Sequence, residues 1–484
     1  MNYRFILKTL GHLLLIEAIL MFLPLGVSIY KNENIIPFVN TIVIILIFGS
    51  ILSLIKIKNK SYFAKEGLMI TTLSWISLSL FGALPFYFSG YFPTYIDAFF
   101  ETVSGFTTTG STILKNIEVL PYGLLFWRSF THWIGGMGIL VFAIAILPLS
   151  NENSMHMIKA EVPGPFTSKL VPKLKDTAKW LYGIYLLLTI LEILLLLLGG
   201  MPLFDSIVTS FATAGTGGFA IKNSSIAFYN STYIDYVISI FMILFGINFN
   251  IFFLIIMKKF KQAISNEEMK AYFGIIITST ILITLNILSI CNNIFEAFRL
   301  SFFQVSSIIT TTGFATTNFD LWPQFSKIIL LFLMFCGACG GSTGGGIKVS
   351  RIVIALKKVI KDFITVIHPN TIKAVRLDKK VVNEKTINDV GYYLVLYFLI
   401  IIFATLIVSL DNFDFETTLT SVITCISNVG PGFSIVGPIG NFADFSGLSK
   451  LVLSIVMLFG RLELYPMLLL FYPLTYIKNK RKQV

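Results

Sequence analysis

Apolar stretches of about 20 residues recur from one end of the chain to the other, and shorter polar or basic segments separate them. This is the length that a helix needs to cross the hydrocarbon core of a bilayer. We place ten spans, near residues 9–30, 36–57, 67–92, 121–149, 179–200, 232–257, 268–291, 322–347, 388–410 and 446–476. The pattern predicts an all-α, polytopic membrane protein.

The composition supports this prediction, because 55% of the 484 residues are hydrophobic and only 13% are charged. A folded protein surrounded by water could not cover so much apolar surface. The first apolar stretch follows Arg4 and Lys8, and no small-residue cleavage site appears before Lys31. We therefore expect a retained helix here, not a signal peptide.

The net charge of +12 is distributed unevenly along the chain. Basic residues gather in alternate connections, at residues 1–8, 56–65, 159–179, 258–270, 348–385 and 478–482. An excess of Lys and Arg marks the cytoplasmic side of a membrane protein. With ten spans, both termini are expected in the cytoplasm of a bacterial cell, and the remaining connections face outward across the plasma membrane.

One unit of span, short apolar segment, Gly/Thr-rich turn and span occurs four times after the first two spans. Residues 97–110 read DAFFETVSGFTTTG and align without a gap with residues 205–218, DSIVTSFATAGTGG. Residues 310–318, TTTGFATTN, align with residues 215–223, GTGGFAIKN, and residues 427–433, SNVGPGF, form a diverged fourth copy. The reference glycines of the four turns are Gly110, Gly218, Gly313 and Gly430.

The short segments before these glycines indicate re-entrant helices, because about 10–14 residues cannot cross a bilayer. Irregular backbone at that depth must be buried in protein or line water. Four equivalent turns would meet around one central axis, which is the geometry of a pore. The expected organisation is two N-terminal transmembrane helices (1–66) and four pore repeats (67–150, 151–262, 263–386 and 387–484).

The chemistry of the turns favours a cation. A re-entrant helix directs the negative end of its dipole toward the turn, and glycine permits backbone conformations that point carbonyl oxygens inward. Rings of carbonyl oxygens replace the hydration shell of potassium in known filters. The candidate filter residues are Thr108, Thr109, Gly110, Thr216, Gly217, Gly218, Thr311, Thr312, Gly313, Asn428, Val429 and Gly430.

Four units of helix, pore loop and helix, each with one glycine in a TTTGF-like turn, resemble the Trk/Ktr/HKT superfamily of potassium transporters. The two extra N-terminal spans resemble its TrkH branch, and the resemblance extends over residues 1–484. It implies potassium uptake, because glycine at all four filter positions accompanies potassium selectivity in this superfamily and serine in the first repeat accompanies sodium transport in plants. Gly110 occupies that first position, whereas Asn428 and Pro431 depart from the pattern in repeat four.

Residues 336–348, CGACGGSTGGGIK, interrupt the second span of repeat three with six glycines. Each glycine disfavours a helix interior by about 1 kcal/mol relative to alanine, so we expect the span to break. A phosphate-binding loop would need Lys and Ser or Thr directly after the last glycine, but Ile347 separates Gly346 from Lys348. Close helix packing through small residues and a mobile intramembrane loop both remain possible at this point.

The resemblance favours the mobile loop. TrkH-like proteins carry a Gly-rich intramembrane loop that obstructs the pore below the filter and moves in gating. By this resemblance the gate residues are Gly340, Gly341, Gly344, Gly345, Gly346 and Lys348.

Arg461 lies within the last span, 17 residues before Lys478. That distance is about 25 Å along a helix, too far for the guanidinium to reach the interface easily. Buried intramembrane charges are costly and usually functional. We expect a pore-facing residue that tunes conduction, as the resemblance also implies; the alternative is a structural ion pair, for which Glu463 is poorly placed because residues i and i+2 of a helix face apart.

Other polar residues carry weaker expectations. Arg128 and His132 are expected to bond to neighbouring helices. Asp97 and Asp205 are expected to cap their re-entrant helices at the outer face, where they could also concentrate cations.

Functions other than transport find little support. Four histidines (His12, His132, His156 and His368) form no metal-ligand spacing, which argues against a membrane enzyme or a haem protein. The cysteines Cys291, Cys336, Cys339 and Cys425 lie in or beside apolar segments and indicate no disulfide framework. The transported K⁺ is the only ligand expected, with no organic cofactor. A sodium or weakly selective monovalent cation channel or symporter is the alternative.

The chain contains no nucleotide-binding motif, so any nucleotide regulation must come from a partner. By resemblance, TrkH-like subunits form homodimers with one pore each and bind a cytoplasmic ring of nucleotide-binding TrkA subunits. The basic segments 150–178 and 348–386 are the candidate surface for that ring. Attraction to anionic lipid explains their charge equally well.

Overall fold

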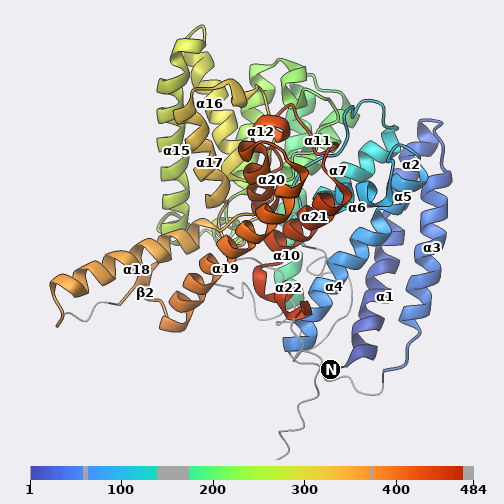
Figure 1. Cartoon of the computed structure of the whole chain (residues 1–484), viewed down its shortest axis with the longest axis horizontal. Coiled ribbons are helices and arrows are strands. Elements are labelled where there is room, and N and C mark those ends of the chain that lie inside the picture. Colours follow the sequence, from blue (N-terminus) through green and yellow to red (C-terminus); the bar gives the residue numbers. More distant parts are fainter. Residues whose placement is uncertain (1, 58–63, 139–173, 371–373, 472–484) are drawn as a thin grey trace, which may run out of the picture.

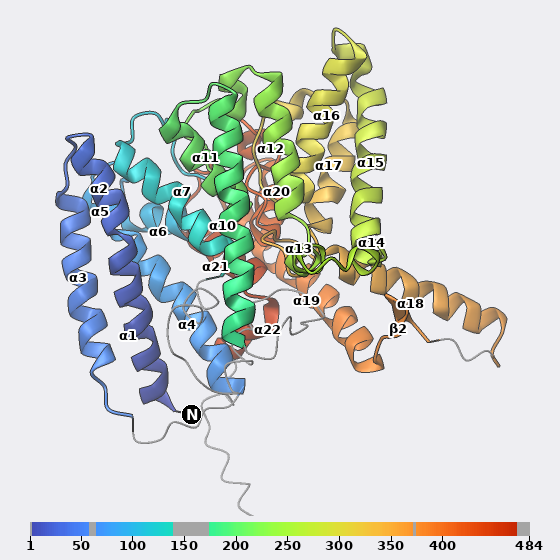
Figure 2. The ribbon, with the colours of Figure 1, turned by 180° about the vertical axis from the view of Figure 1, so that it is seen from behind.

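The computed structural model describes residues 2–57, 64–138, 174–370 and 374–471, and helices dominate them (Figures 1 and 2). The all-α prediction is confirmed. Within the described residues the exception is a small hairpin, in which β1 (Arg376–Leu377) pairs antiparallel with β2 (Lys380–Val381). Short 3-10 helices join the longer elements at Ser225–Tyr229, Leu288–Ile290, Phe319–Leu321, Ser409–Asp411 and Ser434–Val436.

The N-terminal helices form a pair at one side of the molecule (Figure 1). Helix α1 (Tyr3–Leu20) gives way to α2 (Phe22–Tyr30), and α3 (Ile36–Ser53) returns beside α1. The break falls where Pro24 removes a backbone donor and its ring would clash with the carbonyl group four residues earlier, that of Leu20. The pair packs against the first repeat through α2 on α7 and α3 on α5.

Four repeats follow, each with a short helix between its spans. Repeat one contains α4 (Ala64–Gly82), α5 (Leu84–Phe88), α6 (Tyr95–Phe106) and α7 (Tyr122–Gly136). Repeat two contains α10 (Leu174–Leu198), α11 (Leu203–Gly215), α12 (Thr232–Phe245), α13 (Phe249–Ile256) and α14 (Phe260–Ile264). Repeat three contains α15 (Glu267–Ile287), α16 (Ile294–Ile309), α17 (Gln324–Cys336) and α18 (Val349–Ile367). Repeat four contains α19 (Glu384–Val408), α20 (Phe415–Ser427), α21 (Gly447–Arg461) and α22 (Leu464–Phe471).

The four short helices before the reference glycines are α6, α11, α16 and α20, which we call the pore helices. They contain 12, 13, 16 and 13 residues, so none is long enough to cross a bilayer. Side-chain caps fix the start of three of them, from Thr94, Asn293 and Asp414. Helix α11 begins after Pro202, which makes no side-chain cap.

The described residues do not contain the ten unbroken spans that were expected. Six helices are long and apolar enough to cross a membrane, or seven if a pair bent by 91° between α12 and α13 counts as one span. The second spans of the repeats account for the difference. Helix α17 ends at Cys336 where the glycines begin, as expected, whereas the break after Phe245 was not expected. Residues 139–149 and 472–476 of two expected spans lie outside the described residues.

The exposed side chains of the long helices are apolar, which suits contact with lipid. Leu187 on α10, Leu285 on α15 and Phe403 on α19 are more than 60% exposed. Helix α18 instead extends sideways from the bundle, away from the side where α1 and α3 lie (Figures 1 and 2). The basic segment 348–386 is therefore partly displayed on α18 and the hairpin, whereas most of segment 150–178 lies outside the described residues.

Candidate ion-conducting site

The four turns after the pore helices share one backbone conformation. The residue two places before each reference glycine is left-handed, with φ of +54°, +53°, +60° and +54° at Thr108, Thr216, Thr311 and Asn428. The glycines themselves have φ of +86°, +73°, +86° and +102° at Gly110, Gly218, Gly313 and Gly430. Glycine adopts such values readily and other residues do not. The four copies inferred from the sequence are therefore equivalent in backbone geometry.

The backbone amides of the turns point back toward their own pore helices. The residue before each reference glycine donates its N–H to the carbonyl group five residues earlier. These bonds are Thr109 to Ser104 (2.9 Å), Gly217 to Ala212 (2.8 Å), Thr312 to Ser307 (2.8 Å) and Val429 to Thr424 (2.9 Å). We call the extended segments that end at the reference glycines strands one to four (residues 108–110, 216–218, 311–313 and 428–430). The same pattern in all four copies leaves their carbonyl groups on the opposite side of each strand.

Those carbonyl oxygens are largely without donors. Among the described residues, no hydrogen bond reaches the carbonyl oxygens of the twelve candidate filter residues, except that Gly430 accepts one from Ser111 Oγ at 3.1 Å. All but Gly110, Gly218 and Gly313 are buried. A buried carbonyl group needs a partner, and a cation or water in the space between the strands would supply it.

The four strands form a closed ring. A Cβ atom placed on Gly110 would overlap the carbonyl oxygen of Gly217, and one on Gly218 would overlap that of Thr312. A Cβ atom on Gly313 would overlap the carbonyl oxygen of Val429, and one on Gly430 would lie 2.7 Å from that of Thr109. Each repeat thus abuts the next, and the fourth abuts the first. Any side chain at these glycines would push neighbouring strands apart.

The threonine hydroxyls of the strands mostly bond within their own turns. Thr107 Oγ1 lies 2.8 Å from Thr109 Oγ1, and Thr310 Oγ1 lies 2.7 Å from Thr312 Oγ1. Asn428 replaces threonine in repeat four and does something different. Its Nδ2 donates to Thr109 Oγ1 at 2.9 Å and to the Met457 carbonyl at 3.0 Å. The departure from the repeat pattern therefore ties strand four to strand one.

A buried ion pair supports strands one and two from behind. Arg128 Nε on α7 lies 2.6 Å from Glu101 Oε1 on α6, and the two side chains are 2% and 0% exposed. Glu101 also accepts hydrogen bonds from Thr112 Oγ1 and the Ile113 amide, just after strand one. Arg128 donates to the Ala220 carbonyl just after strand two, and its guanidinium lies 3.5 Å from the ring centroid of Phe219. The expectation that Arg128 bonds to a neighbouring helix is confirmed.

His132 lies one helical turn from Arg128 on the same helix. Its ring stacks on Phe219, with centroids 4.2 Å apart. It also fills the space beside Gly217, where a side chain would collide with the imidazole. His132 thus packs behind strand two through its ring.

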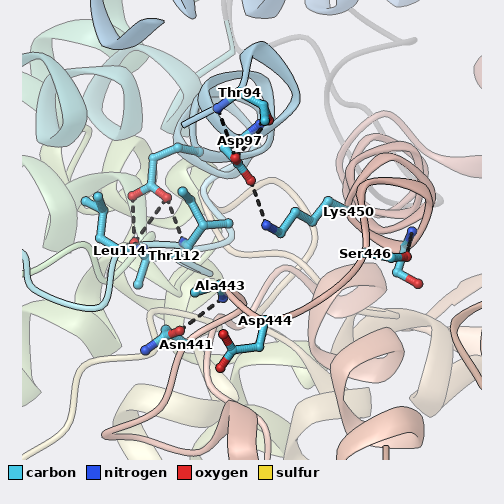
Figure 3. Close-up of polar contacts among 12 residues, drawn as sticks. Thr94, Asp97, Thr112, Leu114, Asn441, Ala443, Asp444, Ser446 and Lys450 are labelled. Carbon is cyan, nitrogen blue, oxygen red and sulfur yellow. Dashed lines mark hydrogen bonds and ion pairs between the residues drawn. The ribbon is translucent and has the colours of Figure 1, made fainter. Parts of the chain in front are cut away.

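Acidic residues anchor the N-terminal ends of the pore helices, though not in the same way in each. Asp97 completes a capping box with Thr94, and its Oδ1 lies 2.6 Å from Lys450 Nζ on α21 (Figure 3). Asp205 does not cap α11; it accepts a hydrogen bond from the Tyr229 hydroxyl at 2.8 Å. Burial and the Asp205 carboxylate together raise the pKa of the Tyr229 hydroxyl. The expectation that Asp205 caps α11 was wrong, because Pro202 holds the N-cap position and its side chain makes no cap.

The glycine-rich segment 337–348, which we call the glycine loop, leaves the end of α17 and returns to it. On the return path Ile347 and Lys348 donate their amides to the carbonyl groups of Phe335 and Cys336, both at 3.1 Å. Lys348 Nζ donates to the Gly344 carbonyl, which closes the last turn of the loop on itself. Positive φ occurs along this path at Gly337, Gly341, Gly346 and Lys348.

The tip of the glycine loop lies against the filter strands. The Gly345 amide donates to Thr311 Oγ1 at 2.6 Å. A Cβ atom on Gly345 would meet the Ser427 carbonyl and Asn428, and one on Gly344 would lie 2.8 Å from the Thr310 carbonyl. The predicted gate residues Gly344 and Gly345 therefore contact strands three and four directly.

The other side of the glycine loop docks on the break between α12 and α13. The Cys339 amide donates to the Gly246 carbonyl at 3.0 Å, and the Phe249 amide donates to the Gly341 carbonyl at 3.1 Å. Thr343 Oγ1 donates to the Phe245 carbonyl at 3.2 Å. The unexpected bend of 91° in repeat two thus exposes backbone groups that the glycine loop uses.

Arg461 joins the glycine loop to repeat one. Its guanidinium donates to the Thr343 carbonyl at 2.6 Å and to the Gly135 and Gly136 carbonyls at 2.5 and 2.6 Å. Glu463 is instead paired with Arg351 on α18. The charge of Arg461 is therefore solvated by backbone carbonyl groups of the glycine loop and of α7.

Two acidic residues were missed from the sequence. Glu101 lies within the quoted motif at residues 97–110 as the one acid among apolar and small residues near its centre, and that isolation was the available signal. Glu268 lies at the start of an expected span, and the polar run NEEMK at residues 266–270 gave no sign that it would be buried. Its carboxylate accepts the Gly340 amide of the glycine loop at 2.6 Å.

Known proteins resemble this chain over nearly its whole length. A family model, TrkH, described as a cation transport protein, matches residues 35–294 and 292–476. The Trk system potassium uptake protein TrkH of Salmonella typhimurium is 36% identical over 481 residues, covering 98% of this chain and 99% of the relative. The protein of that name from Vibrio parahaemolyticus is 33% identical over 482 residues, with the same coverage.

A solved structure gives the same result at the level of the fold. The crystal structure of the potassium transporter TrkH from Vibrio parahaemolyticus matches with a TM-score of 0.89 and 31% sequence identity. The match covers 99% of this chain and 100% of the other. The resemblance inferred from the repeats is confirmed, and the chain belongs to the TrkH family of cation transport proteins.

Proposed function

We propose that this chain carries out potassium uptake across the plasma membrane, through a selectivity filter formed by the four strands that end at Gly110, Gly218, Gly313 and Gly430. The observation that supports this function is the closed ring of buried carbonyl oxygens with few protein donors. Oxygen ligands of this kind replace the hydration shell of a monovalent cation. The similar proteins of Salmonella typhimurium and Vibrio parahaemolyticus are named as potassium uptake proteins, which agrees with it.

In this proposal the glycine loop is the gate and Arg461 sets the electrostatics beneath the filter. The loop contacts strands three and four through Gly344 and Gly345, so it obstructs the inner end of the ring. Arg461 bonds to both the loop and repeat one. A fixed positive charge at that depth would shorten the residence of cations and help to set the rate.

The proposal extends to assembly. Two copies would form a homodimer with one pore each, and a cytoplasmic ring of TrkA-type nucleotide-binding subunits would regulate them. The basic residues of α18 and the hairpin, together with segment 150–178, are the proposed surface for that ring. Both termini would lie in the cytoplasm, on the side where the basic clusters occur.

The experiment is cation flux into liposomes that contain the purified chain, comparing K⁺, Rb⁺, Na⁺ and Li⁺. The variants are Gly110→Ser and Gly313→Ser, which would force strands apart. Gly274→Ser on α15 is the matched control, because that glycine has open space around it. We expect K⁺ and Rb⁺ to enter faster than Na⁺, with a weaker preference in the two filter variants alone. Flux without K⁺ preference in the unsubstituted chain would favour the alternative, a sodium or weakly selective cation channel or symporter.

A further inference from the structure

Glu268 is a buried acid beside the glycine loop, in the first turn of α15. Only 6% of the residue is exposed. Its neighbour Glu267 faces outward and is paired with Lys357 on α18. The two carboxylates are adjacent in sequence but lie in different surroundings, so burial of Glu268 needs an explanation of its own.

One oxygen atom of Glu268 holds both ends of the segment that lies under the filter. Its Oε1 accepts the Gly340 amide at 2.6 Å and the Ser350 amide at 3.0 Å. Gly340 lies on the outgoing half of the glycine loop, and Ser350 lies in the first turn of α18. The residues between them include Gly344 and Gly345, which contact the strands.

The chemistry of these two bonds makes them a strong attachment. The first amides of a helix have no partner within the helix, and a negative charge is stabilised at that end of the helix. Hydrogen bonds to a carboxylate are shorter and stronger than those between neutral groups. The Ser350 amide at the start of α18 therefore suits a carboxylate acceptor.

These two bonds restrain the loop at the inner end of the ring. Its other hydrogen bonds join neutral groups at the break after Phe245, at Thr311 and at the end of α17, and one more comes from Arg461. Moving Gly344 and Gly345 away from the strands requires the chain between positions 340 and 350 to shift. Glu268 fixes the chain at both positions.

We propose that Glu268 is a positioning residue that clasps the two ends of the glycine loop and holds the loop beneath the filter. This inference rests on the proposed function of the loop as the gate. Release of the Glu268 carboxylate from either amide is then a required step in opening. The residue acts on how often the pore is open and has no contact with the filter strands that select the ion.

The test compares Glu268→Ala and Glu268→Gln with the matched controls Glu267→Ala and Glu267→Gln, in liposome flux assays. We expect Glu268→Ala to raise K⁺ flux roughly tenfold, equivalent to about 1.4 kcal/mol in the opening equilibrium. The ratio of K⁺ to Na⁺ flux should not change. Glu268→Gln keeps an acceptor oxygen without the charge, so its K⁺ flux should lie between those of the unsubstituted chain and Glu268→Ala. The Glu267 variants should match the unsubstituted chain.

A second measurement does not depend on flux. Cys339 is fully buried next to Gly340, and its reaction with a water-soluble thiol reagent reports movement of the loop. In a chain whose other cysteines (Cys291, Cys336 and Cys425) are replaced by alanine, Glu268→Ala and Glu268→Gln should speed this reaction and the Glu267 variants should not.

The outcomes separate this inference from the proposed function. Unchanged flux and unchanged Cys339 reactivity in both Glu268 variants would overturn the clasp. Faster Cys339 reaction without any increase in K⁺ flux would support the clasp but reject the loop as the gate. A fall in the K⁺ to Na⁺ ratio in Glu268→Gln would also overturn the inference, because the residue would then act on the filter.

Discussion

Arg128 and Glu101 form an ion pair in surroundings where neither charge can reach water. The two side chains form a salt bridge with each other, and each also bonds to the backbone, Glu101 just after strand one and Arg128 just after strand two. Breaking a buried pair by removing one partner costs about 3–5 kcal/mol, mainly because the other charge is left unpaired. The same removal would release the backbone just after strands one and two, so the proposed filter function couples stability and ion selection at this residue pair.

We expect Arg128→Gln to lower both the thermal stability of the protein and the K⁺ to Na⁺ flux ratio. The double variant Glu101→Gln with Arg128→Gln removes the unpaired charge and should recover much of the stability, but less of the flux ratio. Thermal unfolding in detergent and liposome flux are the two measurements. Arg299→Gln is the control, because its pair with Asp235 is longer, 3.7 Å, and 22% of the arginine side chain is exposed. Equal effects at Arg128 and Arg299 would contradict a special role for the buried pair.

At the scale of elements, the break between α12 and α13 is the surface on which the glycine loop packs and to which it hydrogen-bonds. Asn248 caps α13 by accepting the Asn250 amide at 2.9 Å, and its side chain also lies beside Gly341. The cap defines where α13 restarts, and the free backbone groups of the break then bond to residues of the glycine loop. Two broken helices from different repeats therefore support each other.

Asn248→Ala should weaken this arrangement. Loss of a side-chain N-cap costs about 1 kcal/mol, and here the loop also loses a neighbour. We expect a lower unfolding temperature and a changed K⁺ flux. Ser231→Ala removes the cap of α12, where the Ser231 Oγ accepts the Ile234 amide. It should lower stability to a similar degree with unchanged flux. If both variants changed flux alike, the break would have no specific link to the loop.

The same elements indicate how far the sequence could predict the structure. The glycines of residues 337–346 gave the break in repeat three correctly, because their effect on a helix is local. The break after Phe245 was missed because residues 232–257 are mostly apolar and carry a single glycine, Gly246, near the middle. The helix can break there because residues of the glycine loop, nearly 100 positions later, bond to the backbone groups that the break leaves without helical partners. Tertiary contacts of this kind leave no local signal.

At the scale of the whole molecule, the gapless alignment of the turns predicted four equivalent strands, and their matching φ values agree with that prediction. The partners of Arg461, Glu101 and Glu268 could not be derived in this way. Each partner comes from a different repeat or from a distant part of the same repeat. Internal symmetry predicts what the repeats share, whereas these contacts are made where the repeats differ.

Closure of the ring leads to a prediction about all four filter glycines together. Gly110, Gly218 and Gly313 each leave no room for a Cβ atom against the next strand, whereas at Gly430 that atom would lie 2.7 Å from the Thr109 carbonyl oxygen. We therefore expect alanine at any of the four positions to reduce the K⁺ to Na⁺ flux ratio, with Gly430→Ala the mildest. The conformations with positive φ add a cost of about 1–2 kcal/mol for any residue with a side chain.

The pairwise behaviour of these variants tests the ring itself. Sites that share a contact network do not act additively, so Gly110→Ala combined with Gly313→Ala should reduce the flux ratio little beyond the more severe single variant. Gly274→Ala on α15 is the control and should leave each ratio unchanged, because its position is open. If the four positions acted independently and their effects multiplied, each strand would select ions alone. Non-additive loss would instead mean that selection belongs to the closed ring, which exists only when all four repeats have folded around it.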